Sequence, residues 1–192
     1  MASNTIWRGF LTTIMIGLVL FVANYHVPLS GTKTITYDFR GPDGTISHAY
    51  PVARVRDMAR QNGRTYRPMI EDPVYVDVKT LLPYRVARID LIFQNTTSIP
   101  LAVGMKRAGG TPSFDLKSVE EAPTEGGWSR GSVLFDLSTA SYYNGKYTFA
   151  FSVPGLRTER PGQGEVRLSQ MRLILERPPL SWDDILTLWK NF

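Results

Sequence analysis

The stretch ARIDLIFQ at residues 87–94 decides the fold class of this chain. Apolar Ala87, Ile89, Leu91 and Phe93 alternate in it with Arg88, Asp90, Ile92 and Gln94. Successive side chains of a β-strand point to opposite faces, so a period of two predicts a strand whose one face is buried. The stretch therefore predicts a strand of a sheet that packs on a core.

The same two-residue period recurs on both sides of this stretch. It is found at residues 35–39, 74–78, 101–105, 114–116, 133–137, 147–153 and 166–175. The apolar phase changes between Leu168 and Met171, which predicts a bulge or a bend within one long final strand. About eight or nine strands with almost no helix predict an all-β domain at residues 34–177, an antiparallel β-sandwich of the jelly-roll kind.

Residues 51–63 leave two structures open. Val52, Val55 and Met58 fall at helical spacing, Pro51 is suited to begin a helix and Asn62-Gly63 to end one. The segment is therefore either a short surface helix or an irregular excursion between strands.

An apolar stretch, IWRGFLTTIMIGLVLFVANY, precedes the domain at residues 6–25, and Arg8 is its only charged residue. Twenty residues in a helix span about 30 Å, the thickness of a bilayer's hydrocarbon core. Residues 1–26 thus predict a cytoplasmic tail and a transmembrane anchor, followed by a linker at 27–33 and an extracytoplasmic domain. Phe21 or Leu29 would occupy a cleavage-site position that requires a small residue, which favours an uncleaved anchor.

The end of the chain, residues 178–192, differs in kind from the strands. After Pro178-Pro179, Ser181 is suited to cap an amphipathic helix. The apolar face of that helix contains Trp182, Ile185, Leu186, Trp189 and Phe192. So short a helix needs a surface to dock on, which is its own sandwich, a partner protein or the membrane interface.

The composition excludes several kinds of chemistry. The chain has no cysteine, so disulfides, thiolate nucleophiles and Cys-ligated zinc are absent, and its two histidines lie in no metal or triad motif. The adjacent acids Glu120-Glu121 and Asp183-Asp184 are poor candidates for a glycosidase pair, whose carboxyl groups must face one bond. The net charge of +5 does not by itself imply nucleic-acid binding. We expect no catalysis, no cofactor and no metal.

A basic cluster lies between residues 54 and 67. It contains five arginines, which are Arg54, Arg56, Arg60, Arg64 and Arg67. Either these arginines form a solvated face, or they contact anionic polymers or lipid head groups near a membrane.

The strand order from residue 72 to residue 177 resembles a known superfold. IDLIFQN at 89–95, a loop with Trp128, the Phe-Asp-Leu strand at 135–137, NGKYTFAFSVPGL at 144–156 and VRLSQMRLILERP at 166–178 look like the galactose-binding-like jelly rolls. Many carbohydrate-binding modules and discoidin-type domains share this superfold. The resemblance implies a non-catalytic domain that binds glycans through loops at one end of the sandwich.

A sugar offers one apolar ring face and a rim of hydroxyl groups, so its site needs an aromatic platform and planar hydrogen-bonding side chains. The loop residues that meet this demand are Trp128, Arg130, Tyr142, Tyr143 and Asn144. The alternative for the aromatic residues is structural, with Trp128 covering one end of the core.

Two functions follow. The first is a single-pass, membrane-anchored module that binds a glycan or a cell-envelope polymer. The second is an assembly subunit that docks onto another membrane protein through a sandwich face and the C-terminal helix. An exposed Trp128 in an aromatic-lined groove would favour the first, and a broad apolar patch on the sandwich would favour the second.

Overall fold

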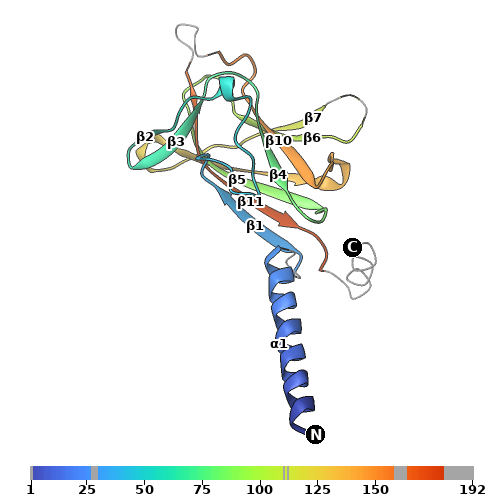
Figure 1. Ribbon diagram of the computed structural model, residues 1–192. Coiled ribbons are helices and arrows are strands. Elements are labelled where there is room, and N and C mark those ends of the chain that lie inside the picture. The colour runs from blue at the N-terminus through green and yellow to red at the C-terminus, as the bar shows by residue number, and fades with distance from the viewer. Residues whose placement is uncertain (1, 27–29, 110, 112, 158–163, 180–192) are drawn as a thin grey trace. The chain divides into compact units, whose positions relative to one another are not determined.

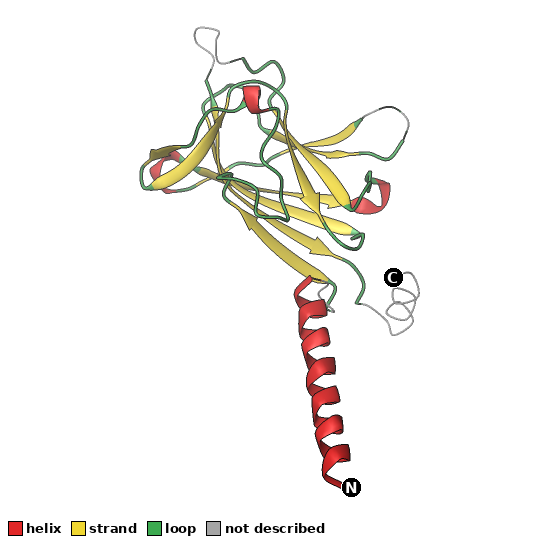
Figure 2. Cartoon of the chain, viewed as in Figure 1, coloured by secondary structure: helices red, strands yellow, loops and turns green. Residues whose placement is uncertain are grey.

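The computed structural model describes residues 2–26, 30–109, 111, 113–157 and 164–179, and within the N-terminal helix it describes the side chains of residues 7–20. Within these residues there are one α-helix, α1 (Ala2–His26), and strands β1 to β11, most of which Figure 1 labels. It divides into two compact units, of which one consists of residues 34–176 and the other of residues 1–33 together with the chain from residue 177 onward. In its described residues the first unit has strands joined by loops and three short 3₁₀ turns, with no α-helix (Figure 2).

Two antiparallel sheets form the sandwich. The seven-stranded sheet has the order β2-β3-β11-β5-β9-β8, with β1 pairing β11 off this path. Its strands are β1 (Thr32–Tyr37), β2 (Ala59–Gln61), β3 (Arg64–Met69), β5 (Val86–Asn95), β8 (Ala122–Pro123), β9 (Ser129–Asp136) and β11 (Val166–Glu176). The second sheet has the order β4-β10-β6-β7. Its strands are β4 (Val74–Lys79), β6 (Ala102–Lys106), β7 (Phe114–Ser118) and β10 (Lys146–Ser152).

The core lies between the inner faces of the two sheets. On β5 the apolar set of the two-residue period, Ala87, Ile89, Leu91 and Phe93, is at most 1% exposed. From the other sheet β10 contributes Phe149 and Phe151, both fully buried. Burial of each large side chain stabilises the fold by about 1.5–3 kcal/mol. The prediction of an antiparallel β-sandwich is therefore confirmed.

The expected irregularity in the last strand is a β-bulge. Leu168 pairs with Phe93, while Gln170 pairs with the next residue of β5, Ile92, so Ser169 is the additional residue. Before the bulge Leu168 faces the core, and after it Gln170 and Arg172 share the outer face of the sheet with Ile92. The bulge thus sets which side chains of β11 point away from the core.

Residues 51–63 form no α-helix. They contain a short 3₁₀ turn, η1 (Val52–Arg54), and then β2, which pairs with β3 as a hairpin. Asn62 and Gly63 make the turn with φ values of 49° and 76°. An Asn-Gly pair tolerates this left-handed backbone, and it therefore joins two strands here instead of ending a helix.

The described part of the chain has eleven strands instead of about eight or nine. The hairpin strand β2 has three residues and β8 has two. A two-residue period cannot be recognised over so few positions, so the sequence pattern missed both. It also missed β3, whose six residues RTYRPM include Pro68, a residue that is uncommon inside a strand.

The N-terminal apolar stretch forms a helix, as expected, and α1 extends from Ala2 to His26. Considering only the residues that the structure describes, we find no helix with the length and apolarity needed to cross a membrane. The expected C-terminal helix with Trp182, Ile185, Trp189 and Phe192 lies outside the described residues.

Candidate ligand-binding groove

A groove with a volume of about 660 Å³ lies on the outer face of the seven-stranded sheet. Strands β11, β5 and β9 form its floor, and the segment before and into β8 forms a wall. It is lined by Arg88, Asp90, Leu91, Ile92, Glu120, Glu121, Ala122, Arg130, Gly131, Ser132, Gln170 and Arg172. The lining is rich in charged and amide groups and includes no aromatic side chain.

The sheet register arranges the floor in two rows across the strands. One row contains Gln170, Ile92 and Arg130. The next contains Arg172, Asp90 and Ser132. Neighbouring strands are about 4.8 Å apart, so each row places three side chains at regular steps on one surface.

Asp90 is the fixed centre of this floor. Its Oδ1 accepts a hydrogen bond from Ser132 Oγ at 2.8 Å and another from Arg88 Nε at 2.9 Å. The Asp90 side chain is 22% exposed and that of Arg88 is 55% exposed. The ion pair therefore stays in contact with solvent, where it contributes to orientation more than to stability.

Two other guanidinium groups in the groove differ from Arg88. Arg130 and Arg172 are both exposed, and within the described part of the chain neither guanidinium group makes a hydrogen bond or an ion pair. On the wall, Glu121 accepts hydrogen bonds from Ser129 Oγ at 3.2 Å and from Asn95 Nδ2 at 3.4 Å. The groove thus presents two cations whose donors are available to a ligand.

Gly131 allows the wall to approach β9. A Cβ atom at this position would lie 2.1 Å from Val119 Cγ1 and 2.8 Å from the carbonyl oxygen of Glu120. Atoms that are not bonded to each other do not approach so closely. Any side chain at this position would therefore displace the segment that carries Glu120 and Glu121. The absence of a side chain at Gly131 therefore shapes the groove.

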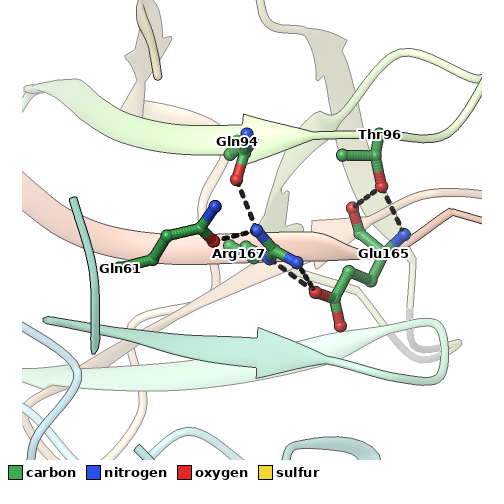
Figure 3. A network of polar contacts seen from close by, with 5 residues as sticks. All are labelled: Gln61, Gln94, Thr96, Glu165 and Arg167. Carbon is green, nitrogen blue, oxygen red and sulfur yellow. Dashed lines mark hydrogen bonds and ion pairs between the residues drawn. The ribbon is translucent and has the colours of Figure 1, made fainter. Parts of the chain in front are cut away.

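Farther along the same outer face, Arg167 holds a polar network (Figure 3). Its Nη1 donates to Gln94 Oε1 at 2.8 Å and also to Gln61 Oε1 of the β2–β3 hairpin, and its guanidinium is ion-paired with Glu165. The guanidinium carbon also lies 5.2 Å from the ring centroid of Tyr66, a cation–π contact. These contacts connect the β2–β3 hairpin to the outer face of β11 and β5.

Trp128 lies beneath this hairpin and not in the open. Trp128 is 2% exposed and Tyr66 is 8% exposed, and their rings meet edge to face with centroids 5.8 Å apart. Neither belongs to the main core cluster between the sheets. Asn62 Nδ2 donates to the carbonyl oxygen of Gly126 at 3.2 Å, which joins the hairpin tip to the loop before Trp128. The expected exposed platform is therefore wrong for Trp128, because the hairpin covers its ring.

The expected site residues do not come together. Arg130 lines the groove, whereas Tyr142, Tyr143 and Asn144 belong to the turn before β10 in the other sheet. The Tyr142 hydroxyl donates to the carbonyl oxygen of Thr80 at 2.8 Å, so this side chain has a packing role. Tyr143 is 74% exposed, and Asn144 has φ 50° in the turn.

The basic cluster is not one solvated face. Arg54 Nη1 donates to the carbonyl oxygen of Pro73 at 2.9 Å, and Arg67 contacts Met58 Sδ and the carbonyl oxygen of Arg40, each at 3.5 Å. Both side chains are partly buried, whereas Arg56, Arg60 and Arg64 are exposed. The contact with anionic polymers or lipid head groups stays a prediction for these three.

Sequence reasoning missed most of the groove. The missed residues are Arg88, Asp90, Ser132, Gln170 and Arg172, which the two-residue period assigns to the solvent side of their strands. No local signal marked these residues, because polar side chains at the outward alternate positions of β5, β9 and β11 are also what a solvent-exposed sheet face carries. Among the described residues, no cluster of His, Asp and Glu is suited to hold a metal ion.

No protein-family model and no curated protein matches the chain. Solved structures with a similar arrangement of strands include three carbohydrate-binding domains. The xylan-binding domain CBM22-1 of Xyn10C from Paenibacillus barcinonensis has a TM-score of 0.47 at 12% identity, over 74% of this chain and 94% of that one. The C-terminal CBM6 of the laminarinase LamC from Zobellia galactanivorans has a TM-score of 0.44 at 12% identity, over 73% and 98%. The second N-terminal cellulose-binding domain of β-1,4-glucanase C from Cellulomonas fimi has a TM-score of 0.43 at 16% identity, over 73% and 91%. These are likenesses of fold alone, and they do not identify a ligand.

Proposed function

We propose that this protein is a non-catalytic glycan-binding module whose ligand lies in the groove across β11, β5 and β9. The observation that carries the proposal is the set of hydrogen-bonding side chains that the register brings to one surface, around the fixed carboxylate of Asp90. The groove volume of about 660 Å³ lies within the range of small-molecule sites. An oligosaccharide of a few units is a ligand of suitable size and polarity.

The chemistry of the lining fits hydroxyl groups. A sugar hydroxyl both donates and accepts a hydrogen bond, so a site needs acceptors and donors in alternation. Asp90 and the wall acids provide acceptors, while Arg130, Arg172 and the Gln170 amide provide donors. Ile92 lies between them and offers a small apolar surface for a sugar C–H face. Because no aromatic side chain lines the groove, polar contacts must supply most of the affinity.

The experiment is to fill the groove without changing its charge. Ser132→Trp places a large side chain on the floor, and we expect retention on a glycan array to fall at least tenfold. The matched control is Leu134→Trp, on the same strand and face but outside the lining. A wild-type protein that binds no glycan on the array, or a Ser132→Trp variant that binds as well as the control, would overturn the proposal.

We propose further that α1 anchors this module in a membrane, with the N-terminus cytoplasmic and the sandwich extracytoplasmic. The described side chains of α1 include exposed apolar groups, among them Phe10, Ile14 and Leu18. The hydroxyl groups of Thr12 and Thr13 donate to the carbonyl oxygens of Arg8 and Gly9 at 2.8 and 3.0 Å, so both are satisfied within the helix. Such internal pairing is what a bilayer requires of polar groups.

The anchor is tested with the full chain in cells. We expect it to sediment with membranes after an alkaline carbonate wash, and the sandwich to be cleaved by protease added outside the cytoplasmic membrane. Replacement of Ile14 and Leu18 by Asp should release the chain into the supernatant. A wild-type chain that the carbonate wash removes, or a sandwich protected from external protease, would contradict this arrangement.

A further inference from the structure

We propose that the groove selects glycans that carry carboxylate groups, with Arg130 and Arg172 as the residues that recognise the acid. This inference rests on the proposed glycan-binding function and names its ligand class. It begins from a contrast among the three arginines of the groove. Arg88 is engaged by Asp90, whereas the donors of Arg130 and Arg172 are not used by any described residue.

A guanidinium group matches a carboxylate better than it matches a hydroxyl group. Its planar N–H groups bind both carboxylate oxygens in parallel, and such charge-assisted hydrogen bonds are about twice as strong as neutral ones. A neutral glycan has no carboxylate, so neither Arg130 nor Arg172 would form these paired, charge-assisted hydrogen bonds with it. An acidic glycan would pair both positions.

The register gives the spacing of the two arginines. Arg130 is on β9 and Arg172 is on β11, with β5 between them and a step of two residues along the strands. Two strand spacings of about 4.8 Å and a two-residue step of about 6.6 Å place their Cα atoms about 12 Å apart. This diagonal separation suits two acidic units of an extended chain that crosses β5.

The acidic side chains of the groove restrict the ligand further. Asp90, Glu120 and Glu121 oppose three arginines, so the lining carries no net charge. A ligand must therefore donate hydrogen bonds to these three carboxylates as well as bring acidic groups to Arg130 and Arg172. A nucleic acid would find no aromatic side chain for base stacking in this lining. A glycan that combines carboxylates with hydroxyl groups meets both demands, because its hydroxyl groups donate to the acids.

The test compares polymers that differ only in the carboxylate. The probes are sodium polygalacturonate and sodium alginate, each beside its fully methyl-esterified form, with binding to the full chain in detergent measured by affinity electrophoresis and calorimetry. We expect at least one acid form to bind tenfold or more tightly than its ester, and this preference to shrink as NaCl is raised. Equal affinity for acid and ester, or binding of neutral array glycans alone, would overturn the inference while leaving the proposed function intact. Binding to no glycan at all would overturn both.

The residue assignment is tested with matched charge changes. Arg130→Gln combined with Arg172→Gln should abolish the preference for the acid form. Arg130→Lys combined with Arg172→Lys should retain part of the preference, because lysine keeps the positive charge but lacks the bidentate geometry of a guanidinium group. Arg85→Gln combined with Arg107→Gln removes the same charge at exposed positions outside the lining and should leave the preference unchanged. If the control pair loses the preference equally, the effect is one of net charge and the assignment is wrong.

Discussion

Trp128 and Tyr66 meet edge to face with ring centroids 5.8 Å apart, outside the main core of the sandwich. Burial of an indole at 2% exposure predicts that Trp128→Ala lowers the free energy of unfolding by about 3–5 kcal/mol. Urea denaturation followed by far-UV circular dichroism measures this change. Tyr143→Ala, at a side chain that is 74% exposed, is the control and should change it by less than about 0.5 kcal/mol. A Trp128→Ala variant as stable as this control would mean that the hairpin does not cover the indole in solution.

Gly131 gives a prediction about the groove wall. Gly131→Ala brings a methyl group against Val119 and the carbonyl oxygen of Glu120, so we expect a loss of about 1–3 kcal/mol in unfolding free energy. Because the wall is displaced, the affinity for a bound glycan should also fall. Gly41→Ala, whose new Cβ atom would meet only His48 Cε1 at an ordinary contact distance of 3.6 Å, is the control and should lower neither quantity. If Gly131→Ala leaves both the unfolding free energy and the glycan affinity unchanged, the segment at Val119 and Glu120 can move away from the new methyl group without loss of stability.

The sandwich was predictable because its core obeys a local rule. Every second residue of β5 and β10 faces the other sheet, and this period is visible in the chain without knowledge of the partners. The bulge at Ser169 was predictable for the same reason, since an added residue shifts the period. Fold class and the longest strands therefore follow from the order of the residues.

The site was not predictable in the same way, because it depends on register between distant strands. Arg130 and Arg172 come to one surface only through their separate pairings with β5. The burial of Trp128 depends on a hairpin more than 60 residues earlier in the chain, whose tip reaches it through Asn62 and Gly126. Polar side chains at outward positions look alike in a sequence whether or not they share a groove, so no local pattern separates a site from a solvated face.

Arg167 connects the β2–β3 hairpin to the outer face of β11 and β5, so its replacement should lower the free energy of unfolding. Arg167→Met keeps much of the aliphatic stem and removes the donors to Gln61 and Gln94. We expect the free energy of unfolding to fall by about 1–3 kcal/mol, since partly buried amide oxygens lose their partner. Hydrogen exchange should show faster opening of β2 and β3 than of β5. Arg88→Met, which removes an exposed ion pair, is the control and should cost less than about 1 kcal/mol.

Three tyrosines make the sandwich sensitive to alkali. Burial raises the pKa of Tyr37, Tyr50 and Tyr147, and at Tyr50 the hydrogen bond from its hydroxyl to Asp77 Oδ1 at 2.9 Å acts in the same direction. Below pH 10 these phenols are protonated in both states, but above it the unfolded chain loses protons that the native state retains, so stability falls as pH rises. We expect Tyr50→Phe to make the decline in unfolding free energy between pH 10 and pH 12 shallower, as measured by urea denaturation at each pH. A slope in Tyr50→Phe equal to that of the wild-type chain would show that Tyr50 ionises as readily in the native state as in the unfolded chain.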